Sequence, residues 1–566
     1  MKNFIVNLLF FYSIFTLHSQ SQLEYPIDQA DNSFQGQIDV SKLGSDHLNL
    51  PGSKGGDHKE PLIKPTEKPN IILVISDQFR RQAMGFVKDG DPVKTPELDK
   101  YKREEAVFFS NGIVNRPICG PNRANILTGQ YNITNGVYGN KVRLSKESNT
   151  LGEITKRNGY RTAYIGKWHL DGAGGPEGYV PKSRRHGFDK WILTRGHSPF
   201  KQKVYIDDSQ KATTASEWET TWLTKKLIGF IRNNKENHSD KPFCAVLSIG
   251  PPHTGGGTGF EDRYQPGKRT RDGKIKYGYG YAAPKIWEDL YPEPKQLTKR
   301  PNATDIIVKN TGEKDEVWPV LPGYYGTISS IDHEFFRLTK YLKDNDLFDN
   351  TIIVFTADHG EMLGSHGRMT KGVWYEESVG VPMLISYPAK VASRTEKSPM
   401  SSVDILPTVL GLADINIPDS IDGFDYSKSL KGEHDVLPEY AFCSFDQGGV
   451  GKGDRSWRSI YSDKYTYVLA NSSWKNFRDL DHIRKEDKMV LYDKVKDPYE
   501  MEPIYKGMGY DDVINDLHKK LVDHLDKMKD PFIEMQWIPS NSEPKYMYKD
   551  ALNAMIPQKG MPKTKK

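Results

Sequence analysis

The 566-residue sequence predicts an α/β fold with a large, mostly parallel central sheet, followed by a smaller antiparallel sheet. From Asn70 onward, short β-rich apolar runs alternate with longer helical segments, a pattern typical of a parallel sheet covered by helices on both faces. Beyond about residue 432 the pattern changes to alternating strands, at 457–461, 464–469 and 489–493, which suit a small antiparallel sheet. We therefore expect a large domain over residues 69–431 and a C-terminal subdomain over residues 432–566.

The first twenty residues have the pattern of a secretory signal peptide. Lys2 precedes an apolar stretch from Phe4 to Leu17, and polar residues follow it. A membrane span needs about 20 continuous apolar residues, so this stretch is too short, and no later segment is apolar enough. We expect residues 1–20 to be cleaved, residues 21–68 to form a polar lead-in segment, and the mature protein to be secreted or periplasmic; a buried or membrane-retained N-terminus is the alternative.

The overall composition excludes few classes of function. A net charge of +5 on so long a chain does not argue for nucleic-acid binding. The three cysteines, at 119, 244 and 443, make a poor disulfide framework for a secreted protein. Cys244 and Cys443 lie in apolar runs, and we expect both to be inert core residues.

Four apolar runs of the predicted sheet end in polar residues of the kind that bind metals or anions. In open α/β sheets, ligands bind beyond the carboxyl ends of the strands, so these tips can converge on one site. A single tip is weak evidence, because an Asp or His at a strand end often serves only as a cap or a turn residue. The four runs and their tips are Ile71–Ile75 with Asp77 and Gln78, Thr162–Ile165 with Lys167 and His169, Phe243–Ile249 with His253, and Ile352–Phe355 with Asp358 and His359.

The segment from Tyr324 to Leu347 predicts a helix that leads into the last of these strands. Its apolar residues recur at a spacing of three to four positions, as on one face of a helix. This arrangement is a helix-then-strand crossover.

The run Cys119-Gly120-Pro121-Asn122-Arg123 is the most specific pattern in the chain, and it continues to Gly129. Pro121 suits the first turn of a helix, so residue 119 is predicted at a helix N-terminus, where free N–H groups favour an anion. The run resembles the maturation signature of the sulfatases, in which the cysteine of a Cys-x-Pro-x-Arg run is oxidised to formylglycine (3-oxoalanine). The alternative is a lone cysteine packed as a small hydrophobe, which would leave the eleven-residue match unexplained.

The resemblance covers roughly residues 69–500, and further parts of it lie at Gly166–His169, Thr351–Gly360 and Ser402–Thr408. It implies an alkaline-phosphatase-like α/β sandwich and a C-terminal α+β subdomain closed by a helix, here Asp511 to Lys529. Among sulfatases, the chain resembles the secreted bacterial polysaccharide enzymes. The resemblance also implies a maturation enzyme that oxidises Cys119.

The resemblance implies a divalent cation, usually calcium, bound by Asp77, Asp358, His359 and the hydrated aldehyde at residue 119. An oxygen-rich site suits calcium or magnesium better than a thiolate-seeking metal. Gln78 is a departure, since many family members carry a second Asp there. Gln78 either binds the metal through its carbonyl or stands behind the ligands, and the sequence leaves both interpretations open.

The resemblance also implies the roles of the remaining site residues. The metal and Asp358 activate the hydrated aldehyde for attack on sulfur. Arg123, Lys167 and Lys371 neutralise the sulfate oxygens. His253 protonates the leaving sugar oxygen, and His169 takes a proton from the second hydroxyl so that sulfate is released.

A long insertion between His253 and Trp318 carries interleaved basic and aromatic residues, among them Arg269, Arg271, Tyr281 and Trp287. Basic groups suit sulfates and aromatic faces suit sugars, so we interpret the insertion as a wall of the substrate pocket, with Arg269 and Arg271 binding an acidic glycan. A solvated loop without function and a site for single-stranded nucleic acid are the alternatives.

Together these patterns predict a secreted, calcium-dependent sulfatase acting on a sulfated glycan, such as ulvan, an algal galactan or glycosaminoglycan oligosaccharides. A phosphodiesterase or phosphonate monoester hydrolase is the first alternative, because some of these relatives share Asp-Gln at the first metal tip. Choline sulfatase is a second, although a wall of Arg and Lys would repel a quaternary ammonium. A catalytically silent glycan-binding protein is a third, but it would not need both His169 and His253.

Overall fold

The computed structural model describes residues 68–172, 178–196, 199–200, 202–215, 217–253, 281–304, 306–307, 314–315, 317, 320–446, 456–470 and 489–532. The predicted signal peptide, almost all of the lead-in segment, and Arg269 and Arg271 of the insertion lie outside these residues. Among the described residues, no helix is both long and apolar enough to cross a membrane.

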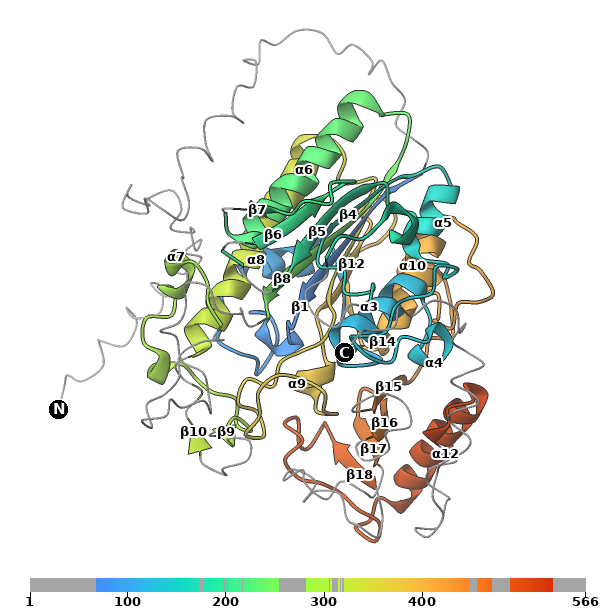
Figure 1. The fold of residues 1–566 in the computed structure, drawn as a ribbon. Helices are drawn as coiled ribbons and strands as arrows, with labels where there is room; N and C mark the ends of the chain where they lie inside the picture. The colour runs from blue at the N-terminus through green and yellow to red at the C-terminus, as the bar shows by residue number, and fades with distance from the viewer. Residues whose placement is uncertain are drawn as a thin grey trace, which may run out of the picture. The chain divides into compact units, whose positions relative to one another are not determined.

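The large sheet contains ten strands in the order β13-β2-β12-β11-β1-β8-β4-β5-β6-β7 (Figure 1). Its centre is parallel, as the apolar runs predict, and β1 lies between β11 and β8. Every residue of β1, β8 and β11 is buried, so these strands form the core. The parallel strands are β1 (Asn70–Asp77), β4 (Arg161–Gly166), β5 (Lys190–Arg195), β8 (Phe243–Pro252) and β11 (Thr351–Ala357).

Both edges of this sheet contain antiparallel pairs, so the sheet is mixed. On one side β12 runs antiparallel to β11 and to β2, and β13 is parallel to β2. On the other side β6 runs antiparallel to β5 and β7. The strands of these two outer parts are β2 (Val107–Phe109), β6 (Gln202–Ile206), β7 (Thr213–Ala215), β12 (Met383–Ser386) and β13 (Arg394–Glu396), and β13 and β7 form the two edges.

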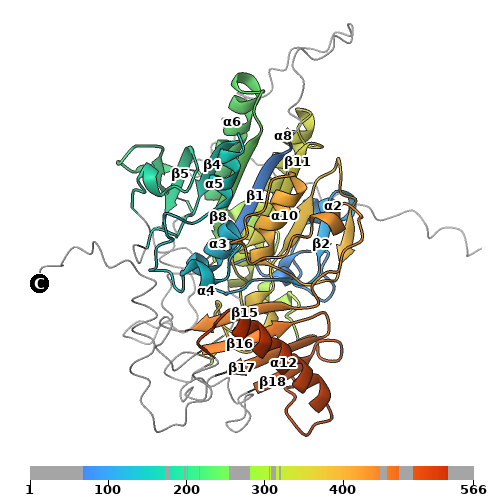
Figure 2. The ribbon, with the colours of Figure 1, turned by 90° about the vertical axis from the view of Figure 1, so that its right-hand side faces the viewer.

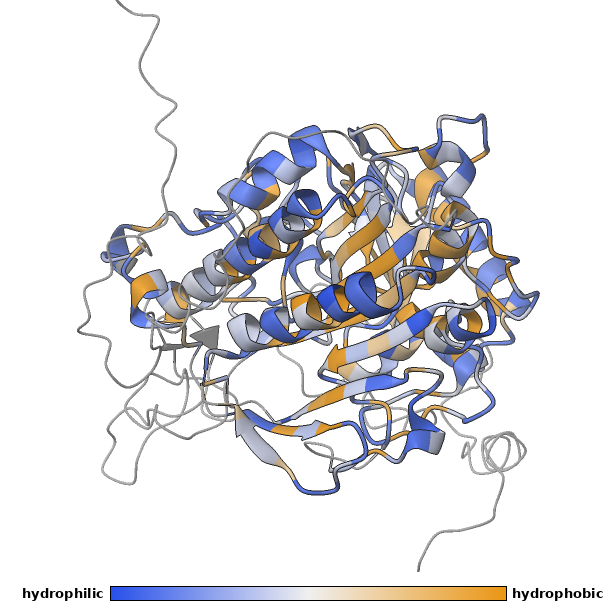
Figure 3. Cartoon of the chain, turned by 90° about the horizontal axis from the view of Figure 1, so that it is seen from above, coloured by the Kyte–Doolittle hydropathy of each residue, from blue (hydrophilic) through white to orange (hydrophobic). Residues whose placement is uncertain are grey.

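Helices lie on both sides of the apolar strands, as Figure 3 shows from above. The predicted helix before β11 is confirmed as α8 (Leu321–Asp344), and its apolar residues Ile328, Ile331, Phe335 and Leu338 are buried. It packs beside α6 (Glu219–Asn237) and α2 (Pro96–Glu104). A second group contains α3 (Cys119–Thr128), α5 (Leu151–Arg157) and α10 (Ile405–Leu412), in which α3 contacts both of the others.

The predicted small sheet is confirmed as four antiparallel strands with a helix across them (Figure 2). The helix α12 (Asp511–Lys527) packs Ile514, Leu517, Leu521 and Leu525 into an apolar cluster with the strands. The strands are β15 (Ala441–Asp446), β16 (Ser456–Tyr461), β17 (Tyr465–Ala470) and β18 (Met489–Asp493). The predicted α/β fold class is therefore confirmed.

Short elements connect these layers. They are the 3-10 helices Arg81–Ala83, Lys182–Arg184, Pro294–Gln296 and Ser402–Asp404, the strands β3 (Gly112–Ile113), β9 (Ile306–Ile307), β10 (Lys314–Asp315) and β14 (Met400–Ser401), and the helices α4 (Asn132–Asn135), α7 (Lys285–Glu288), α9 (Glu376–Val379) and α11 (Ser427–Leu430).

Cys244 on β8 and Cys443 on β15 are buried, and neither forms a disulfide. Burial raises the pKa of the Cys244 thiol to about 12. Burial also raises the pKa of Cys443, against the opposing charge of Arg116. Both thiols are thus protonated core groups at neutral pH, as predicted.

Candidate active site

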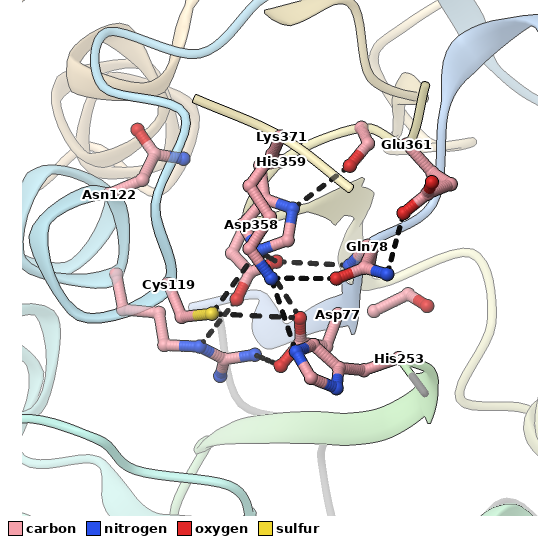
Figure 4. Close-up of polar contacts among 12 residues, drawn as sticks. Asp77, Gln78, Cys119, Asn122, His253, Asp358, His359, Glu361 and Lys371 are labelled. Carbon is pink, nitrogen blue, oxygen red and sulfur yellow. Dashed lines mark hydrogen bonds and ion pairs between the residues drawn. The ribbon is translucent and has the colours of Figure 1, made fainter. Parts of the chain in front are cut away.

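The predicted tips of β1, β8 and β11 lie together in Figure 4, and the tip of β4 joins them through the contact of Lys167 with Asp77. Asp77 ends β1, Lys167 follows β4, His253 follows β8, and Asp358 follows β11. Parallel pairing aligns Ser76 with Ala357, so Asp77 and Asp358 lie on neighbouring strands at the same level. The sheet topology therefore places these side chains around a common point.

Cys119 reaches the same point from α3, which begins at this residue, as predicted. Its side chain is 3% exposed, and its sulfur lies 3.1 Å from Nε2 of His359 and 3.9 Å from Oδ1 of Asp77. Gly120 follows because a Cβ there would lie 2.9 Å from the backbone oxygen of His169. This contact places half-buried His169 beside the first turn of α3.

The carboxylates of Asp77 and Asp358 are fully buried and face several cations. Nε of Arg123 donates to Oδ2 of Asp358 at 2.8 Å, and NH2 of Arg123 lies 3.7 Å from Oδ2 of Asp77. Nζ of Lys167 contacts that same Asp77 oxygen. These pairs compensate the cost of burying the carboxylates.

The charges shift the pKa values of the two carboxyls in opposite directions. Burial raises the pKa of Asp77, but Lys167, His253, His359 and Arg123 together hold it well below its ordinary value. Burial and the neighbouring charge of Asp77 raise the pKa of Asp358, against the opposing charges of His359 and Arg123. Asp77 is thus the carboxylate that stays ionised most easily.

The cations also act on Cys119. Burial and the charge of Asp77 raise the pKa of its thiol, yet Lys167, Lys371 and His359 prevail and lower it well below the ordinary value. A group at this position is therefore stabilised as an anion.

Asp77, Cys119, Asp358 and His359 can offer ligand atoms that all lie within 4.8 Å of one another. Nδ1 of His359 donates to the carbonyl of Gly360 at 3.0 Å, and this bond orients Nε2 toward the cluster, 3.1 Å from the sulfur of Cys119. Carboxylate oxygens and an imidazole nitrogen suit a hard divalent cation, so the residues present fit a metal.

Arg123 has a buried nitrogen that indicates an anion-binding site. The residue is fully buried, and its NH2 nitrogen has no hydrogen-bond partner among the described residues. Buried donors are nearly always paired, so this nitrogen is available to an anion that enters the site.

Gln78 lies behind the cluster and bonds at both ends of its carboxamide. Its Oε1 accepts from Nζ of Lys371 at 2.6 Å, and its Nε2 donates to Glu361 at 2.6 Å and to the hydroxyl of Tyr281 at 2.9 Å. Lys371 in turn lies 3.1 Å from Nε2 of His253. The structure thus brings Gln78, Lys371 and His253 together, as the sequence predicts.

Glu361 was not predicted as a member of this network. Tyr281 was predicted in the insertion, but not as a partner of Gln78. The signal for Glu361 is its place two residues after His359 at a strand tip. Tyr281 belongs to the insertion that we predicted as a substrate wall, but it is buried. Trp287 is buried too, on α7, with its ring 5.5 Å from that of His333, so these two aromatics pack against the domain and are not free to form such a wall.

Comparison with known proteins decides the family. The sulfatase family model matches residues 69–415, and the model of the N-sulphoglucosamine sulphohydrolase C-terminal region matches residues 364–527. The chain belongs to the sulfatase family. The predicted resemblance is confirmed, and the protein is an enzyme that hydrolyses sulfate esters.

Curated sulfatases align over most of the chain. It is 33% identical to the ulvan-active sulfatase of Formosa agariphila over 476 residues, which cover 83% of each protein. It is 27% identical to the endo-4-O-sulfatase of Bacteroides thetaiotaomicron over 533 residues, which cover 86% of this chain and 97% of the relative. Sulfatases of this family generally use a formylglycine and a divalent metal, which agrees with the cluster around Cys119.

Solved structures share the fold. The yidJ sulfatase of Bacteroides fragilis superposes with a TM-score of 0.69 at 27% identity and covers 85% of this chain and 100% of its own. The phosphonate monoester hydrolase of Agrobacterium radiobacter has a TM-score of 0.59 at 21% identity, with 81% and 96% covered, and this likeness shows the fold alone.

Proposed function

We propose that this sulfatase removes sulfate from a sulfated glycan, with a formylglycine at residue 119 as the nucleophile and calcium as the metal. One observation carries the proposal: the side chain at residue 119 lies among two carboxylates and an imidazole, beside the NH2 of Arg123, which no described residue hydrogen-bonds. This arrangement offers a cation site and an anion site on either side of one reactive group.

Asp77, Asp358, His359 and residue 119 would hold the cation. Their hard ligands favour calcium, with magnesium as the second choice. When bound, the cation supplies Lewis acidity next to residue 119. Lys167 holds Asp77 ionised, and the carbonyl of Gly360 orients His359, so the chain itself prepares these ligands.

Arg123, Lys167 and Lys371 would surround the sulfate. The NH2 group of Arg123 and the ammonium groups of both lysines lie around Cys119, and they can offset charge on the sulfate oxygens. His253 contacts Lys371 and is placed to hand a proton to the leaving oxygen. His169, beside the first turn of α3, would accept the proton that drives sulfate release.

A glycan is the substrate class that the relatives favour. The aligned enzymes include an ulvan-active sulfatase, an endo-4-O-sulfatase and an N-acetylglucosamine-6-O-sulfatase. The predicted signal peptide agrees with degradation of glycans outside the cytoplasm or in the periplasm. We assign the basic insertion, with Arg269 and Arg271, to the binding of a second acidic group on the glycan.

Desulfation assays test the reaction and the substrate class together. We expect sulfate release from ulvan or glycosaminoglycan oligosaccharides and from an aryl sulfate, but little hydrolysis of a matched aryl phosphodiester. The Arg269→Ala/Arg271→Ala variant should lose turnover of oligosaccharides and keep that of aryl sulfate, with Lys226→Ala, an exposed cation on α6, as the control.

Faster turnover of the phosphodiester would favour the phosphonate hydrolase alternative. Activity on choline sulfate with none on any sulfated sugar would contradict a glycan substrate. Equal losses on both substrates in the arginine variant would show that the insertion does not bind the glycan.

A further inference from the structure

We propose that Glu361 is a positioning residue that sets the direction of a hydrogen-bond chain through Gln78 to Lys371. In this way it fixes the ammonium of Lys371 in the active site without touching the substrate. The inference rests on the proposed function, which places Lys371 at the sulfate.

Glu361 is fully buried and uses both carboxylate oxygens (Figure 4). Oε2 accepts from Nε2 of Gln78 at 2.6 Å. Oε1 accepts from the backbone N–H of Leu363 at 2.9 Å and of Thr370 at 2.6 Å. One side chain thus ties the loop that ends at Lys371 to the tip of β1.

The chemistry of these groups permits only one direction for the chain. A carboxylate can only accept, so the NH2 end of the Gln78 carboxamide must face Glu361. Oε1 then faces away, where it accepts from the ammonium of Lys371 at 2.6 Å. A reversed carboxamide would place its NH2 group against the ammonium, and both groups can only donate.

The backbone supports the same interpretation. Gln78 and Thr370 both adopt φ of 69°, a left-handed conformation that is costly for residues other than glycine. The N–H of Gln78 donates to Oδ1 of Asp358 at 3.2 Å, and its carbonyl accepts from Tyr324 at 2.9 Å. Both ends of the hydrogen-bond chain are therefore held in place by specific bonds.

This arrangement explains why an amide stands at residue 78, where many sulfatases carry an acid. A carboxylate there would face the carboxylate of Glu361 at hydrogen-bond distance in a buried site, which is strongly unfavourable. Residues 78 and 361 are thus a matched pair of one amide and one acid. The carbonyl of Gln78 serves Lys371 in this pair, so we assign it to positioning and not to the metal.

An exchange of the two groups tests the pairing. The Gln78→Glu and Glu361→Gln variants each keep the side-chain length but place two acceptors or two donors face to face. Each should lower kcat/KM for an aryl sulfate by roughly 10- to 100-fold, the range expected when a buried charged hydrogen bond is broken.

The double variant Gln78→Glu/Glu361→Gln restores one acid and one amide, with the polarity of the pair reversed. The NH2 group of the amide at position 361 then donates to the acid at position 78, which still accepts from Lys371. The carbonyl oxygen of that amide still accepts from the N–H groups of Leu363 and Thr370, as Oε1 of Glu361 does in the wild type. We expect kcat/KM to recover to within about ten-fold of the wild type. Thermal unfolding of each variant shows that the folded enzyme is being compared.

The matched control is Glu334→Gln, which changes another buried glutamate, bonded to Thr221 on α6 and to Arg337 on α8. Combined with Gln78→Glu, it should rescue nothing. Rescue by this control, or a double variant no more active than its weaker parent, would overturn the proposal.

A second variant decides the matter if the Glu361 variants do not fold. Gln78→Met interrupts the hydrogen-bond chain without adding charge, and it should lower kcat/KM for an aryl sulfate by roughly 10-fold or more, but by less than Lys371→Met, which removes the ammonium itself. Wild-type activity in Gln78→Met would overturn the proposal. Wild-type protein that releases no sulfate would instead refute the proposed function.

Discussion

Two buried clusters of charge in this protein are built differently. Near the small sheet, Arg116, Asp446, Arg458 and Asp530 alternate in sign: Asp446 accepts from Arg116 at 3.0 Å and from Arg458 at 3.1 Å, and Asp530 accepts from Arg458 at 2.7 Å. At the strand tips, Asp77 and Asp358 face Arg123, Lys167 and His359, with Lys371 close by.

We interpret the difference as that between a cluster that stabilises the fold and the candidate active site. In the first cluster two guanidinium groups meet two carboxylates, and the charges cancel. In the second, the cations Arg123, Lys167 and Lys371 outnumber the carboxylates Asp77 and Asp358, and the pKa of Cys119 is lowered. An unbalanced buried cluster is costly unless a ligand completes it, which indicates function.

The largest effect is expected from Cys119→Ala. Removal of the nucleophile should lower kcat for an aryl sulfate by about 10⁴-fold or more, because a covalent route is lost altogether. Thermal unfolding should change little. Cys443→Ala, which removes a buried thiol on β15, should retain turnover, and an active Cys119→Ala variant would refute the role of residue 119.

Asp358→Ala should have the next largest effect. It removes a charge from the metal cluster and leaves Arg123 without its 2.8 Å partner, so we expect loss of metal and about a 10³-fold loss of kcat. Calorimetric titration with calcium measures the loss of metal binding. Chelation of the metal from the wild type should also abolish turnover. Unchanged calcium affinity in this variant would contradict the proposed ligand set.

Arg458→Met tests the other cluster, and its expected effect is on stability. The variant leaves Asp446 and Asp530 without their shared guanidinium, so the free energy of unfolding should fall by about 3 kcal/mol or more. Urea unfolding measures this loss. Sulfate turnover per folded molecule should stay near the wild-type value, and a selective loss of turnover would erase the distinction between the clusters.

Much of the active site could be predicted from the sequence, but some of its contacts could not. Asp77, Lys167, His253 and Asp358 follow apolar runs, and parallel strands bring such tips together whatever the loops do. The pairing of Gln78 with Glu361 could not be predicted, because it depends on the left-handed conformation of Gln78 and on a loop that returns at Lys371. The short strand β2 could not be predicted for a similar reason, since its three residues pair only with strands near the end of the large domain.

The smallest effect concerns Glu219, which lies behind the strand tips. Burial raises its pKa to about 7, while the N–H of Gly250 and the charge of Lys167 lower it in part. The folded chain therefore keeps a proton that the unfolded chain loses near pH 4.5, so the free energy of unfolding should fall as pH rises from about 4.5 to 7.

The fall should amount to about 3 kcal/mol at most, as the shift in pKa allows. Glu219→Gln removes this titration, so the difference in unfolding free energy between wild type and variant should change across the same pH range. Urea unfolding at pH 5, 6, 7 and 8 measures it. If the unfolding free energies of the two proteins changed with pH in the same way, the raised pKa of Glu219 would be wrong.

Mass spectrometry of the tryptic peptide from Glu104 to Arg123 tests whether residue 119 is a formylglycine, on protein made in a host that contains the maturation enzyme. We expect active enzyme to carry the aldehyde at residue 119, with a mass lower than that of the thiol and with reactivity toward hydrazides. The yield of aldehyde should rise in proportion to sulfatase activity across preparations. Fully active protein that contains only the unmodified Cys119 thiol would show that the enzyme does not use a formylglycine.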